Sequence, residues 1–139
     1  MSTFCADGLI PARFLCLVAH FIMLIMALNH REQNVKACLP YDYDNYLYME
    51  QDKRLMIGYT LSIGFIGIEM FGFMSGITMF SPTNGFISMI CHGVATVMMF
   101  YFLQDLWSCE MFWSVFFLCS ILPCLIELIM ISYSFIMKK

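Results

Sequence analysis

Four long apolar stretches run through this chain, and each carries one ionisable residue near its middle: His20, Glu69, His92 and Glu127. Placing a charged side chain at the centre of a bilayer costs roughly a few kcal/mol or more. Such residues therefore usually face the interior of a helix bundle. The pattern predicts an all-α membrane protein, folded as a compact antiparallel bundle of four transmembrane helices.

The composition agrees with a polytopic membrane protein. Hydrophobic residues make up 61% of the 139 residues and charged residues 12%, and the mean hydropathy is +0.79, outside the range of soluble domains. A hydrocarbon core of about 30 Å takes about 20 apolar residues per helix, so four spans use nearly the whole chain. We expect one tetraspan domain over residues 1–139, with short loops, one longer loop after the first helix, and helices at about 10–28, 55–80, 86–103 and 111–137.

Lys and Arg residues do not fix the orientation by themselves, because they lie on both sides of the spans. Arg13, Lys138 and Lys139 lie on the side of the termini, and four others lie in the first loop. An even number of spans puts both termini on one side, and the two final lysines abut the last helix. We therefore expect both termini in the cytoplasm. The net charge is −3 and no basic run is present, which argues against nucleic acid as a partner.

Interface anchors are predicted at the ends of the spans. Arg13 is within a turn of the start of the first span, from which its guanidinium can reach the lipid headgroups. A gating charge is the alternative interpretation of this residue. Trp107, Lys138 and Lys139 also have the positions and residue types that are typical of membrane interfaces.

The loop at residues 29–54 contains four closely spaced tyrosines: Tyr41, Tyr43, Tyr46 and Tyr48. Tyrosines at this density are typical of an aromatic belt at headgroup level. The alternative is a small ordered cap that meets a partner. The sequence leaves both interpretations open.

Glycines and prolines predict how the helices pack. Small residues let helix backbones approach closely in lipid, so we expect contacts inside the bundle at four glycines of the second helix; a homo-oligomer is the alternative. The segment 81–85 has the composition of a tight turn, and Pro123 is expected to kink the last span. The four glycines are Gly64, Gly67, Gly72 and Gly76.

The four midplane residues have a structural and a functional interpretation. Helical rise places Glu69 and His92 within two turns of the same height. A carboxylate and imidazole pair, joined by His20 and Glu127, would form a single polar layer that fixes which helices pack together. The alternative is a proton or metal site, but these residues lack the local spacing of metal ligands. The sequence predicts no metal, no cofactor and no catalytic residue.

Two cysteines, Cys38 and Cys109, lie in loops that must share one side of the membrane. On an exoplasmic face they could oxidise to a disulfide. The sequence leaves the bonded and the free state open.

Several short strings occur in a specific order. They are GLIPARFL at 8–15, LVAH at 17–20, ACLP at 37–40, SGITMF at 75–80 and FLCS at 117–120, followed by Pro123 and Glu127. Through these strings the chain resembles the transmembrane protein 107 family over nearly its whole length. The resemblance also supports His20, Cys38, Glu69, His92, Cys109 and Glu127.

This resemblance implies a non-enzymatic, tetraspan scaffold of the ciliary transition zone. Family members are expected to work with the Meckel syndrome module, which includes tectonic-type and other multi-pass proteins. The implied role is to place other proteins at the ciliary base for ciliogenesis, ciliary gating and Hedgehog signalling.

From the residues alone, two further classes compete with a scaffold. The first is a small proton-coupled or ion-conducting membrane protein that uses Glu69, His92 and Glu127. The second is an intramembrane lipid enzyme, which ranks last because the sequence lacks a recognisable arrangement of nucleophile and base.

Overall fold

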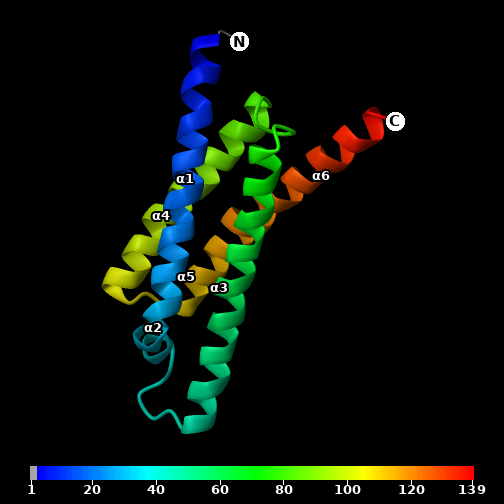
Figure 1. Ribbon diagram of the computed structural model, residues 1–139. Helices are drawn as coiled ribbons and strands as arrows, with labels where there is room; N and C mark the ends of the chain where they lie inside the picture. Colours follow the sequence, from blue (N-terminus) through cyan, green and yellow to red (C-terminus); the bar gives the residue numbers. More distant parts are fainter. Residues whose placement is uncertain (1–2) are drawn as a thin grey trace.

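Four long helices dominate the computed structural model, which describes residues 3–139, with side chains described from residue 7 onward. The candidate membrane spans among these residues are Asp7–Asn29, Asn45–Met74, Pro82–Asp105 and Cys109–Met137. They confirm the prediction of an all-α membrane protein with four spans. Both ends of the described chain lie at one end of the bundle, and the connection between the first two spans lies at the other end (Figure 1).

The first span is α1 (Thr3–Asn29), and it is followed by the short helix α2 (Arg31–Ala37). α1 begins earlier than residue 10, so Pro11 lies inside the helix and not in its first turn. The start of the expected loop is therefore helical. We call α2 the cap, because it covers this end of the bundle with Val35 buried in the main apolar core.

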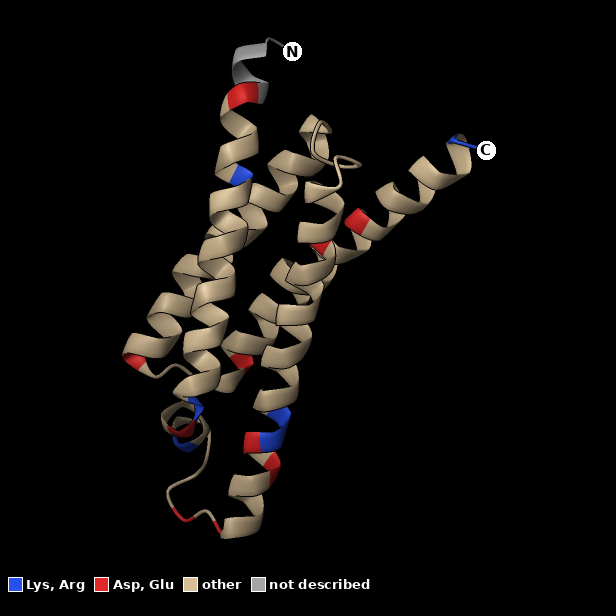
Figure 2. Cartoon of the chain, in the orientation of Figure 1, with Lys and Arg blue, Asp and Glu red and all other residues tan. Residues whose placement is uncertain are grey.

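The cap is also tied to the next span by an ion pair. Arg31 Nε donates to Asp52 Oδ1 at 2.6 Å, and this hydrogen bond raises the pKa of the Arg31 guanidinium. Many of the charged residues gather at this end of the bundle (Figure 2). Tyr41 of the predicted aromatic belt is fully exposed there. The position of the four tyrosines at headgroup level stays a prediction.

The second span, α3 (Asn45–Met74), differs from the expected range 55–80 at both ends. It begins earlier because Asp44 caps the helix, with Oδ1 accepting a hydrogen bond from Leu47 N at 2.8 Å. It ends earlier because Gly76 adopts a φ of 81°, a left-handed conformation that commonly stops helices. Residues 75–81 therefore form a connection and not a final helical turn.

The third span, α4 (Pro82–Asp105), starts four residues before the expected position. Proline suits the first position of a helix because its missing N–H would have no helical partner there. α4 packs along α1, and it lies antiparallel to α3 across the short connection (Figure 1).

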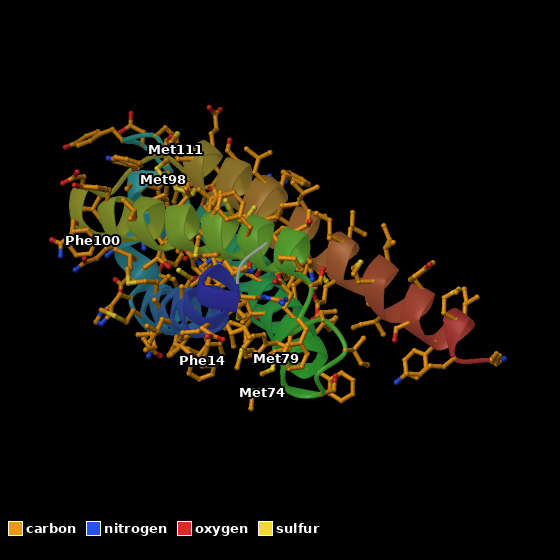
Figure 3. All side chains as sticks on the ribbon, turned by 90° about the horizontal axis from the view of Figure 1, so that it is seen from above. Phe14, Met74, Met79, Met98, Phe100 and Met111 are labelled. Carbon is orange, nitrogen blue, oxygen red and sulfur yellow. A yellow bond between two sulfur atoms is a disulfide. The ribbon has the colours of Figure 1, made fainter. Side chains whose placement is uncertain are left out.

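The fourth span consists of α5 (Cys109–Val115), the π-helical segment η1 (Phe116–Ile121) and α6 (Leu122–Met137). The π-helical segment ends two residues before Pro123, where the sequence predicts a kink. Seen from the end that carries the termini, α6 extends away from the other spans, whereas the labelled Phe14, Met74 and Phe100 lie on the outside of the bundle (Figure 3).

Candidate functional site

Three of the four midplane residues form a chain of contacts across three spans. His92 Nε2 of α4 lies 2.9 Å from both carboxylate oxygens of Glu69 in α3. The Nδ1 atoms of His92 and His20 are 2.8 Å apart, and Ser88 Oγ donates to Glu69 Oε2 at 3.0 Å. All four side chains are buried. We call His20, Glu69, Ser88 and His92 the His/Glu chain.

The geometry of the His/Glu chain limits where its protons lie. One hydrogen lies between His92 Nε2 and Glu69: either the imidazole N–H donates to the carboxylate, or a protonated carboxyl donates to the imidazole. Because only one hydrogen fits between the two Nδ1 atoms, one imidazole donates there and the other accepts. The His/Glu chain therefore connects α1, α4 and α3 through directional hydrogen bonds.

Glu127 belongs to a second group of buried residues. Its Oε2 accepts hydrogen bonds from Arg13 Nη2 at 2.9 Å and from Asn84 Nδ2 at 2.7 Å. Its Oε1 accepts a short hydrogen bond from the Thr78 hydroxyl. Arg13 Nη1 also donates to the Thr78 carbonyl at 3.2 Å. We call Arg13, Thr78, Asn84 and Glu127 the Glu127 cluster.

The structure corrects the expectation that Arg13 is an interface anchor. Its side chain is 1% exposed, and its guanidinium lies 5.2 Å from the centre of the Phe73 ring. A carboxylate within reach offers a charge-assisted hydrogen bond inside the bundle, and the side chain points inward to make it. Arg13 therefore balances the charge of Glu127 instead of reaching the headgroups.

The expected single polar layer is divided into two. His20 follows Arg13 by seven residues on α1, and His92 follows Asn84 by eight residues on α4. At 1.5 Å per residue, the two groups lie about 10–12 Å apart along these helices. Glu127 therefore pairs near the end of the bundle that carries the termini, and the His/Glu chain lies deeper.

Cys38 and Cys109 are joined in a disulfide that links the cap to α5. Trp107 stacks on Tyr101 with ring centres 6.0 Å apart, near the same end of the bundle. Lys138 and Lys139 are exposed at the opposite end, after α6. The redox state of the two cysteines in the cell and the anchoring role of these other residues stay predictions.

Comparisons with known proteins give a consistent family assignment. The TMEM107 family, described as "Transmembrane protein", matches residues 9–131. The chain belongs to this family. It is 36% identical over 133 residues to transmembrane protein 107 of both Rattus norvegicus and Homo sapiens, covering 96% of this chain and 95% of each relative. The Danio rerio protein of the same name is 33% identical over 124 residues, covering 89% and 92%. No solved structure matches the chain.

The family assignment confirms the resemblance drawn from the short strings. The shared name describes a transmembrane protein and no enzymatic activity. In the part of this family member that the structure describes, no group of three or more His, Cys, Asp or Glu residues could hold a metal ion.

Sequence reasoning missed three members of the two groups, namely Thr78, Asn84 and Ser88. The signal for two of them was available, because residues 84, 88 and 92 are spaced by four and lie on one face of α4. Thr78 gave no such signal, since it lies in the connection after α3 and meets Glu127 only through tertiary packing.

Of the four glycines that the sequence predicts to pack against other helices, only Gly72 does so. An added Cβ would meet nothing within 4 Å at Gly64, Gly67 or Gly76. Gly64 and Gly67 face outward, and Gly67 borders an apolar groove of about 370 Å³ between α1 and α3. Close packing occurs instead at Gly72, beside Glu127, and at Gly58, where an added Cβ would lie 2.7 Å from Phe112.

Gly72→Ala is expected to destabilise the protein by about 1–3 kcal/mol, the usual cost of overpacking. The new methyl group would collide with Glu127 Oε1, and this oxygen cannot move aside without losing its hydrogen bond to Thr78. Gly64→Ala is the matched control in the same helix, where the added methyl meets open space and improves helix propensity. Unfolding of both variants in lipid bicelles tests the difference; equal stabilities would contradict the packing at Gly72.

Proposed function

We propose that this protein is a non-enzymatic, multi-pass scaffold of the ciliary transition zone. In this role it helps assemble and localise proteins of the Meckel syndrome module, including tectonic-type and other multi-pass components. The expected consequences are normal ciliogenesis, ciliary gating and cilium-dependent Hedgehog signalling. Membership of the TMEM107 family over nearly the whole chain is the observation that carries the proposal.

The use of the buried polar residues supports an assembly role. The carboxylates of Glu69 and Glu127 accept hydrogen bonds from residues of other elements of the same chain. Polar contacts of this kind fix the relative positions of helices in lipid. A bundle with fixed helix positions presents constant outer faces, which is what a scaffold needs to bind membrane partners.

The proposed orientation places both termini in the cytoplasm. A disulfide persists in an oxidising environment, and the bond between Cys38 and Cys109 joins the end of α2 to the start of α5, with α2 at the end of the bundle opposite the termini (Figure 1). An exoplasmic position of the cap therefore agrees with cytoplasmic termini and with the two lysines after α6.

Replacing Glu69 or His92 by leucine is expected to weaken partner association severalfold. Each change leaves a buried polar partner without its hydrogen bond, so the relative positions of α3 and α4 are no longer fixed. Proximity labelling from the tagged chain in ciliated cells measures the recovery of Meckel-module proteins. Val94→Leu, a change on the exposed face of α4, is the control. Recovery equal to the control at equal protein abundance would contradict the proposal for these residues.

A second candidate function is proton or ion conduction, which the continuous contact from His20 through His92 to Glu69 favours. Chains of titratable side chains inside membranes often mark proton paths. Proton flux in liposomes that is lost in Glu69→Gln would support conduction. Liposomes without flux above the protein-free background would favour the scaffold.

A further inference from the structure

The fourth span contains a weak point in its backbone. η1 replaces regular α-helical hydrogen bonds by π-helical ones between Phe116 and Ile121, and Pro123, two residues after η1 ends, has no N–H to donate. Helices bend at π-helical turns and at prolines. The two features together form a joint at residues 116–123.

The segment before this joint is held firmly. Cys109 of α5 is bonded to Cys38, and Phe112 packs edge-on against Tyr59 of α3 with ring centres 4.7 Å apart. Both Phe112 and Tyr59 are buried. Movement about the joint would therefore shift α6 and leave α5 in place.

The helix after the joint, α6, has few buried residues. Within α6, the buried residues are Pro123, Cys124 and Glu127, and every residue from 128 to the end is at least partly exposed. Figures 1 and 3 show this half of the helix leaving the bundle. Apolar contacts restrain it little, because lipid tails can replace an apolar helix face without a hydrophobic penalty.

Glu127 makes the hydrogen bonds that tie α6 to the bundle, while Ile131 adds an apolar contact beside Gly72 of α3. The carboxylate accepts hydrogen bonds from Arg13 of α1, from Thr78 of the connection and from Asn84 of α4. Gly72 provides the space for this carboxylate beside α3. One side chain thus bonds α6 to α1, to α4 and to the connection after α3, and packs against α3 at Gly72.

We propose that the fourth span is a jointed arm, with its joint at residues 116–123 and the Glu127 cluster as its latch. With the latch closed, α6 keeps a single angle to the bundle. When the hydrogen bonds to Glu127 are broken, α6 swings about the joint while α1, α3, α4 and α5 keep their positions.

Distance measurements between spin labels in lipid nanodiscs test the arm. One label replaces Phe80 in the connection after α3, and the other replaces Ile136 in α6; both side chains are exposed. The labels are attached to a genetically encoded ketone amino acid, because the chain has seven cysteines. A reference pair at the exposed Leu61 of α3 and Val97 of α4 reports on the rest of the bundle.

In the native sequence we expect one narrow distance distribution for the Phe80 and Ile136 pair. Glu127→Gln, which removes the charge at nearly constant shape, is expected to shift or broaden it by about 5 Å, the length of one helical turn. The reference pair should not change. An unchanged Phe80 and Ile136 distribution with an intact reference pair would overturn the proposal.

A second variant keeps the test decisive if Glu127→Gln alters the reference pair. Thr78→Val with Asn84→Leu removes two neutral donors and retains the ion pair, so we expect a smaller broadening in the same direction. A distribution identical to that of the native sequence would overturn the latch. Adding Pro123→Ala to Glu127→Gln should narrow the distribution again, and an equally broad distribution would overturn the joint.

Discussion

Glu127→Leu is expected to lower the free energy of unfolding by about 3–5 kcal/mol, because it leaves a buried charge without its partner. Arg13 is 1% exposed and would retain only the Thr78 carbonyl as a hydrogen-bond acceptor, at 3.2 Å, together with its contact to the Phe73 ring. Thr78 and Asn84 would also lose their acceptor. Reversible unfolding in bicelles measures the loss.

The double variant Arg13→Leu with Glu127→Leu is the control for this effect. Replacing a whole buried ion pair by apolar residues of similar size is often neutral or even stabilising. The double variant should therefore be more stable than Glu127→Leu alone. A loss equal to the sum of the two single losses would show that Arg13 and Glu127 do not act as a pair.

Removing the disulfide is expected to cost about 2–4 kcal/mol, which is typical for a native cross-link. The bond joins residues 71 positions apart, but the membrane already confines the unfolded spans, so the lower part of this range applies best. Cys38→Ser, Cys109→Ser and the double variant should lose equal amounts of stability, because each removes the same bond. Unfolding in bicelles with and without reductant measures these losses.

Cys16→Ser is the matched control, because Cys16 is a free cysteine within α1. It should retain the response of the native protein to reductant. If reductant leaves the native protein unchanged, or if the double variant loses the sum of the single losses, Cys38 and Cys109 are not bonded to each other.

The all-α fold with four spans could be predicted because it depends on apolar length, which the sequence displays directly. The helix ends could not, because they depend on local contacts. α3 begins where Asp44 accepts a hydrogen bond from Leu47, and it ends before Gly76 turns to a positive φ. Hydropathy carries no information about this capping hydrogen bond or about the backbone conformation of Gly76.

The sequence predicts which ionisable residues are buried, but it predicts only some of their hydrogen-bond partners. His20, Glu69 and His92 do meet, as the helical rise suggested. The position of Arg13 near the end of a predicted span is equally typical of an interface anchor, so the sequence does not indicate its pairing with Glu127. Only the tertiary structure shows that the Arg13 side chain reaches from α1 to Glu127 of α6, with Nη2 2.9 Å from Oε2.

The most direct test of the scaffold proposal is the location of this protein in ciliated cells. The chain would be tagged at its C-terminus, after the exposed Lys139, expressed from its own promoter and imaged against markers of the ciliary base. The proposal predicts enrichment in a ring or spot at the transition zone. A diffuse distribution over the plasma membrane or the endomembranes, without enrichment at the ciliary base, would contradict it.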